Sequence, residues 1–231
     1  MSYHSDALAR HGPAMPIPLQ GGVDPYIARI YSNLLAALAI MALTGWITHH
    51  LAPPGWLRPL ALADGFLWVA CGWFGWRRPM GLVFPAFVLV TGALLGLLAS
   101  EAPETFALAS WLTLATFAGL TAFVWISRID FSFLVGFLCV SFFLMLAGSF
   151  ARFLIAAPWF HIGWTALGVL TFACWVLYDT GNIVRRADGA QDEQIAAFEL
   201  FLDIVGFHRW LLEHLRLLDL FGWKWKFWER D

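Results

Sequence analysis

Residues 80–100 read MGLVFPAFVLVTGALLGLLAS, and this stretch contains no charged side chain. A run of about 20 apolar residues is the length that an α-helix needs to cross a lipid bilayer. Runs of the same kind occupy most of the chain on both sides of this stretch. We predict spans at 30–51, 57–76, 80–100, 106–127, 131–157, 159–184 and 195–222. The sequence therefore predicts an all-α, polytopic membrane helix bundle with about seven transmembrane helices.

The composition excludes most soluble classes of protein. Hydrophobic residues make up 60% of the 231 residues and charged residues 13%, against roughly 25% charged in an average soluble domain. The mean hydropathy is +0.70, so the lipid bilayer is the expected surrounding. The net charge of -2 gives no indication of nucleic-acid binding. We find no nucleophile–base set, no cofactor motif and no structural metal site, so we expect neither an enzyme nor a bound cofactor.

The chain divides into three parts. Residues 1–29 are rich in proline and glycine and predict a mobile tail, residues 30–222 form the bundle, and residues 223–231 form a basic, aromatic tail. The positive-inside rule places the amino terminus in the cytoplasm. The basic residues that would share that side are Arg29, Arg77, Arg78, Arg128, Arg185 and Arg186. The basic end of the chain fits this rule only if the last segment is re-entrant, so its crossing stays open.

Two aspartates interrupt predicted spans. An ionisable residue inside a membrane helix costs about 2.5–3.5 kcal/mol on insertion scales, so it is a functional candidate by default. Asp179 follows a long apolar run, and the alternative is an interfacial aspartate paired with Arg185 or Arg186. Asp64 lies in the second span, and the alternative is a charge near the interface at the helix start. The many aromatic residues are most simply explained as lipid contacts and interface belts.

The last predicted span, 195–222, carries a dense set of charges. Glu199 and Asp203 are four residues apart and share a helix face, where two carboxylates resist being ionised together. Arg209, Glu213 and Arg216 have the spacing to satisfy one another on another face. The alternative is an amphipathic helix that lies on the membrane surface.

Several stretches in the second half of the chain resemble the Bax inhibitor family, also called the transmembrane Bax inhibitor motif family. The stretch VLYDTGNIVRRADG contains a YDT-type motif at 178–180, and AAFELFLDIVGFHRWLLEHLRLL contains an LYLDI-type motif at 200–204. SRIDFSFLVGFL, at 127–138, resembles the turn that leads into the fifth helix of the family. RFLIAAPWFHIG, at 152–163, resembles the bacterial branch that modulates the FtsH protease. The similarity is specific from about residue 128 to 218.

The resemblance implies a helix bundle around a central last helix, and a mechanism. Asp179 and Asp203 would form a proton-sharing, pH-sensing and ion-binding pair, with Glu199 as a third carboxylate beside it. Arg77 or Arg78 would be the arginine latch, and the spacing does not choose between them. Asp64 falls where some bacterial members carry an acid in the second helix. Arg209 departs from the family pattern, and its charge could neutralise the acidic group and abolish conduction.

Three functions follow as expectations. The first is a pH-sensitive calcium leak in the bacterial inner membrane, with calcium bound only transiently because carboxylate oxygens suit it. The second is a non-conducting modulator that binds a membrane protease and is engaged through the tail 1–29. The third is a structural subunit of a larger membrane complex.

Overall fold

The computed structural model describes residues 24–74, 80–185 and 192–220. Within these ranges it contains seven α-helices, one short 3-10 helix and no strand, which confirms the predicted all-α class. The elements are α2 (Pro25–Leu51), η1 (Pro54–Trp56), α3 (Leu57–Phe74), α4 (Met80–Glu101), α5 (Pro103–Ser127), α6 (Leu134–Ala151), α7 (Pro158–Arg185) and α8 (Glu193–Leu220).

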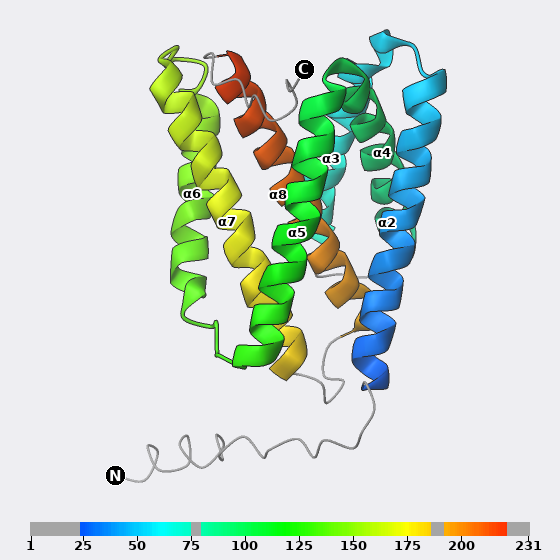
Figure 1. Cartoon of the computed structure of the whole chain (residues 1–231), viewed down its shortest axis with the longest axis vertical. Coiled ribbons are helices and arrows are strands. Elements are labelled where there is room, and N and C mark those ends of the chain that lie inside the picture. Colours follow the sequence, from blue (N-terminus) through cyan, green and yellow to red (C-terminus); the bar gives the residue numbers. More distant parts are fainter. Residues whose placement is uncertain (1–23, 75–79, 186–191, 221–231) are drawn as a thin grey trace, which may run out of the picture.

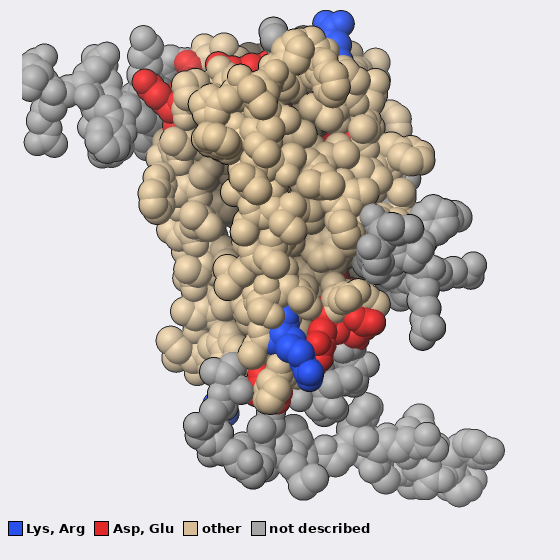
Figure 2. Space-filling view, turned by 90° about the vertical axis from the view of Figure 1, so that its right-hand side faces the viewer, with Lys and Arg blue, Asp and Glu red and all other residues tan. Residues whose placement is uncertain are grey.

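The helices form an upright bundle with an apolar middle zone. Among the described residues, α2, α4, α5, α6 and α7 are long and apolar enough to cross a membrane. In Figure 2, most charged side chains on the visible face gather at the upper and lower ends, and a broad uncharged band separates them. This distribution fits a bundle whose middle lies in hydrocarbon and whose ends meet the two polar interfaces.

The helix boundaries differ most from the predicted spans in α2 and α6. Helix α2 begins at Pro25, five residues before the predicted start, because Asp24 Oδ1 accepts a hydrogen bond from the Tyr26 N–H at 2.8 Å and Pro25 occupies the first turn. Helix α6 spans only Leu134–Ala151, inside the predicted 131–157. Asp130 accepts a hydrogen bond from the Ser132 N–H, and this turn replaces the first predicted residues of the helix.

Helix α8 runs through the centre of the bundle as one unbroken helix (Figure 1). Its 28 residues would extend about 42 Å at 1.5 Å per residue. The surface-helix and re-entrant alternatives are therefore wrong, because α8 is continuous and packed on several sides. Helix α8 carries more charged residues than the five apolar helices do.

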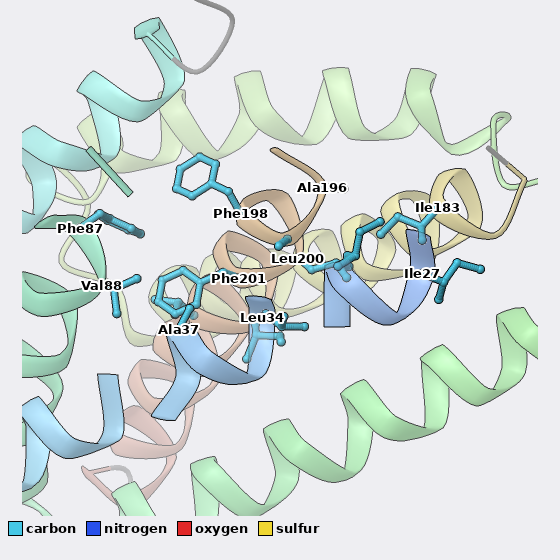
Figure 3. Close-up of a cluster of buried hydrophobic side chains, with 14 of the residues drawn as sticks. Ile27, Leu34, Ala37, Phe87, Val88, Ile183, Ala196, Phe198, Leu200 and Phe201 are labelled. Atoms are coloured by element: carbon cyan, nitrogen blue, oxygen red, sulfur yellow. The ribbon is translucent and has the colours of Figure 1, made fainter. Parts of the chain in front are cut away.

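The main hydrophobic core confirms the central position of the last helix (Figure 3). Phe198, Leu200 and Phe201 of α8 are at most 3% exposed and pack between α2 and α4. The partners in this core include Ile27, Leu34 and Ala37 of α2, Phe87 and Val88 of α4, and Ile183 of α7. In a bilayer, close van der Waals packing of these side chains holds α8 in the middle of the bundle.

Helices α2 and α4 approach closely at a set of glycines. A Cβ atom on Gly96 would overlap the Gly45 carbonyl oxygen and the Thr48 side chain. A Cβ on Gly92 would lie 3.0 Å from the Met41 Cα. Small residues at such positions let helix backbones pack directly in a membrane.

Gly96→Ala is expected to destabilise the protein by about 1–3 kcal/mol, because the methyl group overpacks a backbone contact. The matched control is Gly119→Ala, since a Cβ on Gly119 meets nothing within 4 Å. Alanine there should leave stability unchanged or raise it slightly, because glycine is the poorer helix former. Thermal unfolding of the purified variants in detergent measures both, and equal melting temperatures would contradict the close approach.

Candidate functional site

Two buried aspartates face each other where α7 packs against α8. Asp179 lies near the end of α7 and Asp203 in the first half of α8, with exposed fractions of 8% and 4%. Their carboxyl groups lie within hydrogen-bonding range of each other. Asp203 Oδ2 has no hydrogen-bond partner among the described residues. The structure therefore brings together the two aspartates that the resemblance paired, from helices whose docking the sequence could not supply.

Glu199 adds a third carboxyl group to this site. It lies one turn before Asp203 on α8, and its charge acts on both Asp179 and Asp203. Glu199 and Asp203 line the same cavity, so the predicted shared face is confirmed. Carboxyl groups this close repel one another when all are ionised.

Arg185 does not pair with Asp179. It forms an ion pair with Asp130, donates from Nη2 to Asn182 Oδ1 at 3.0 Å, and donates from Nε to the Gly181 carbonyl at 3.3 Å. The interfacial alternative for Asp179 is therefore wrong with respect to Arg185, and Arg186 lies outside the described residues. The ion pair ties the α5–α6 loop to the end of α7, close to the acidic pair.

Asp130 is an exposed acid in that loop with several donors around it. The Ser132 backbone N–H and side chain, together with Arg185, hold the pKa of Asp130 below its usual value. A lowered pKa in the folded protein stabilises it above the ordinary aspartate pKa of about 3.9, and this stabilisation is lost as the pH falls through the lowered value. The charge of Asp130 therefore stabilises this loop at neutral pH, and this stabilisation is lost in acid.

Asp130→Asn is expected to lower the melting temperature slightly near neutral pH, because an exposed ion pair contributes little. The difference from the parent should shrink as the pH falls through the lowered pKa of Asp130, since the parent carboxylate is then protonated too. Melting curves of both proteins across acid pH values measure this. A gap of constant size at every pH would contradict the role of the Asp130 charge.

Asp64 is completely buried, and each of its two carboxyl oxygens has a partner. Its exposed fraction is 0%, Thr91 Oγ1 donates to Oδ1 at 2.6 Å, and Arg209 forms an ion pair with Oδ2. The interfacial alternative for Asp64 is wrong, because the residue is an interior link between α3, α4 and α8. Arg209 is therefore committed to Asp64 rather than to the acidic pair.

Two arginines near the second half of α8 also pair between elements. Arg152, directly after α6, lies 3.4 Å from Glu213 of α8, and Arg216 of α8 lies 3.5 Å from Glu101 at the end of α4. The prediction that Arg209, Glu213 and Arg216 satisfy one another on α8 is wrong. Each finds its partner on a neighbouring helix, because α8 is surrounded by other elements rather than by lipid.

A cavity of about 840 Å³ lies along one face of α8 and is also lined by α3, α6 and α7. Its α8 lining includes Glu199, Asp203, Arg209, Glu213 and Arg216. From the first to the last of these the helix rises about 25 Å, close to the thickness of the roughly 30 Å hydrocarbon core. Glu199 and Asp203 thus lie at the end of the cavity nearer the start of α8, and the paired arginines lie nearer its other end.

Four tryptophans line this cavity and were not anticipated as site residues. Trp68, Trp164, Trp175 and Trp210 face it, so the explanation of the aromatics as lipid contacts and interface belts is wrong for them. Only the structure pairs bulky rings of the cavity wall with glycines on neighbouring helices. A Cβ on Gly148 would overlap Trp164, one on Gly168 would overlap Trp210, and one on Gly206 would overlap Phe172. These glycines provide the room that seats the rings.

Several predicted features lie beyond what the structure describes, and residues 1–23 of the predicted mobile tail are among them. The latch candidates Arg77 and Arg78 lie outside the described residues, as does the basic tail. Within the described ranges, no group of three or more histidine, cysteine, aspartate or glutamate side chains is arranged to hold a metal ion.

The architecture and the site define the class of protein first: a polytopic α-helical membrane protein with a buried carboxyl pair between its last two helices. A family model described as "Inhibitor of apoptosis-promoting Bax1" matches residues 23–220. That match covers most of the chain, so the chain belongs to this family, the Bax inhibitor family. The resemblance that was noted from the motifs is confirmed.

Similar proteins come from distant organisms. The chain is 29% identical over 205 residues to "Bax inhibitor 1" of Schizosaccharomyces pombe, which covers 84% of this chain and 77% of that protein. It is 28% identical over 118 residues to an "Uncharacterized membrane protein" of Vibrio cholerae, covering 51% of this chain and 52% of that one. It is 31% identical over 109 residues to "Protein lifeguard 4" of Mus musculus, covering 47% and 45%.

Proposed function

We propose that the protein is a pH-sensitive calcium leak of the bacterial inner membrane, gated by Asp179 and Asp203. The observation that carries the proposal is the buried contact between these two carboxyl groups beside a cavity that follows α8. Family membership supports a membrane protein of this class, and the conducted ion and the gating are the proposal.

The chemistry of the site favours a divalent cation that competes with protons. Carboxylate oxygens are the ligands that calcium prefers, and Asp203 and Glu199 both line the cavity. Protonation of the pair removes the charge that attracts the ion, whereas ionisation leaves repulsion that an entering cation relieves. The occupancy of the site by calcium and the protonation of the pair are therefore linked.

The orientation is part of the proposal. Arg29, Arg128 and Arg185 lie at the ends of α2, α5 and α7 that point the same way in Figure 1. This distribution supports a cytoplasmic amino terminus under the positive-inside rule. The acidic pair would then lie toward the cytoplasmic half of the bundle, because Asp179 is close to the end of α7.

The test is calcium entry into liposomes that carry the purified full-length protein, recorded from about pH 6 to 8, because buried carboxyl groups that repel one another titrate above the ordinary aspartate range. We expect an entry rate above that of empty liposomes and dependent on pH. Empty liposomes and liposomes with Asp219→Asn are the controls, since Asp219 lies at the far end of α8. Flat, background entry at every pH would overturn the proposal.

The second candidate is a non-conducting modulator or subunit that binds a membrane protease or another membrane complex. It is favoured by the 23 residues that precede the α2 cap at Asp24, because a segment of this length is long enough for a partner protein to bind. Deleting residues 1–23 is then expected to change the half-life of membrane-protease substrates in cells and to leave calcium entry into liposomes unchanged. Unchanged substrate half-lives together with altered calcium entry would contradict this candidate.

A further inference from the structure

We propose that the cavity between α3, α6, α7 and α8 binds a lipophilic organic cation, an ammonium or phosphonium ion carrying apolar groups. Its walls are aromatic, its lower part carries a buried aspartate oxygen without a partner, and its volume exceeds what a metal ion needs. The ligand would place its charge near Asp203 and its apolar groups against the indole rings.

The aromatic walls are built into the fold rather than left by chance. Trp164 and Trp210 pack edge to face with their ring centres 4.5 Å apart, and Trp68 packs edge to face on Phe172 at 6.1 Å. The glycines beneath Trp164, Trp210 and Phe172 hold these rings in place. Aromatic faces attract cations through their negative π surface, and tryptophan is the strongest of them.

One wall of the cavity already holds a cation of the chain itself. The guanidinium carbon of Arg152 lies 5.1 Å from the centre of the Trp164 ring. This contact is within the range of about 6 Å for a cation–π interaction. The same kind of ring surface continues along the cavity at Trp68, Trp175 and Trp210.

The charge balance of the cavity favours a cation. Arg209 is paired with Asp64, Arg152 with Glu213, and Arg216 with Glu101, so the three arginines that line it are neutralised by carboxylates.

Beyond these pairs, Asp203 faces the cavity, and it is 4% exposed with Oδ2 lacking a hydrogen-bond partner among the described residues. A buried acceptor without a partner costs free energy, which a bound cation recovers.

The size of the cavity indicates an organic ligand. Its volume is about 840 Å³, within the range of roughly 300–1,000 Å³ that pockets for drug-sized molecules occupy. A metal ion would use only the carboxylate end and would leave the indole rings without a ligand. An apolar cation uses both parts, because its charge is spread and its loss of hydration on entering an apolar site is small.

This inference shares Asp203 with the proposed calcium leak, yet binding needs no conduction, so the two can fail separately. Calcium entry without binding of the organic cation would overturn the inference alone. Binding without calcium entry would support the inference and overturn the leak.

The experiment measures binding of radiolabelled tetraphenylphosphonium to the purified full-length protein in detergent. Parent and Asp219→Asn should bind it saturably and equally, because Asp219 lies away from the cavity at the end of α8. Asp203→Asn should weaken binding at least about tenfold, the change that corresponds to about 1.4 kcal/mol. Tetraphenylborate has the same shape and the opposite charge, so it should not displace the bound phosphonium.

A second variant keeps the test decisive if Asp203→Asn does not fold. Trp175→Leu retains an apolar side chain and removes one aromatic wall, so it should weaken phosphonium binding while its melting temperature stays near that of the parent. The inference is overturned if parent, Trp175→Leu and any folded Asp203→Asn bind the phosphonium equally. It is also overturned if tetraphenylborate competes as well as unlabelled tetraphenylphosphonium.

Discussion

Asp203→Asn and Asp179→Asn are each expected to remove the pH dependence of calcium entry into liposomes and to reduce or lock the entry rate. Asparagine keeps the shape of the side chain and removes the ionisable oxygen, so the pair can no longer exchange one proton. We expect a change of at least about tenfold in the rate at the most active pH, which corresponds to about 1.4 kcal/mol in the barrier.

The control for both variants is Asp219→Asn, the same substitution at the exposed end of α8, where Asp219 accepts a hydrogen bond from Thr105 at 3.1 Å. It should conduct like the parent at every pH. The two pair variants should also behave alike, since the site titrates as a unit. A parent-like pH profile in either pair variant would contradict the gate and shift the balance to the protease modulator.

Arg209→Met is expected to cause the largest loss of stability of any single substitution considered. It leaves Asp64 as an uncompensated charge with an exposed fraction of 0%, and breaking a buried pair in this way costs about 3–5 kcal/mol. Asp64→Asn should cost less, because the Arg209 side chain is 34% exposed and can turn its charge toward the cavity. The exposed fractions of the two partners predict this asymmetry.

The double variant Asp64→Asn with Arg209→Met removes both charges and should recover most of the stability lost in Arg209→Met. Thermal unfolding of the four proteins in detergent provides the complete cycle. If the two single variants lose equal amounts of stability and these losses add in the double variant, Asp64 and Arg209 do not interact as the structure shows.

The same ion pair has a consequence for conduction. In the sequence, Arg209 looked able to neutralise the acidic group, because it lies six residues after Asp203 on the same helix. In the structure Asp64 holds Arg209, with Thr91 completing the link. Asp64→Asn frees this guanidinium to approach Asp203 and Glu199, so calcium entry through this variant should fall even though the pair is intact.

The sequence motifs predicted more of the candidate site than the helical periodicity did. Asp179 and Asp203 stood out as charges within predicted spans, the YDT-type and LYLDI-type stretches paired them, and the structure places them in contact. Periodicity alone could not pair them, because residues on two helices meet only after the helices dock in one register. The alternatives for Asp64 and for the last helix failed for a related reason, since both assumed lipid or water where other helices lie.

The sequence by itself determined the helical class and the placement of the segments, because the bilayer requires long apolar runs and satisfies their backbone only in helices. It also singled out the charged residues of the spans as functional candidates, since a charge in hydrocarbon is rarely retained without use. Only the tertiary structure decided the partners: Arg209 with Asp64, Arg152 with Glu213, and four tryptophans around a cavity. The reason is that ion pairs and ring contacts between helices depend on distances of a few ångströms, which arise from packing and leave no periodic trace along the chain.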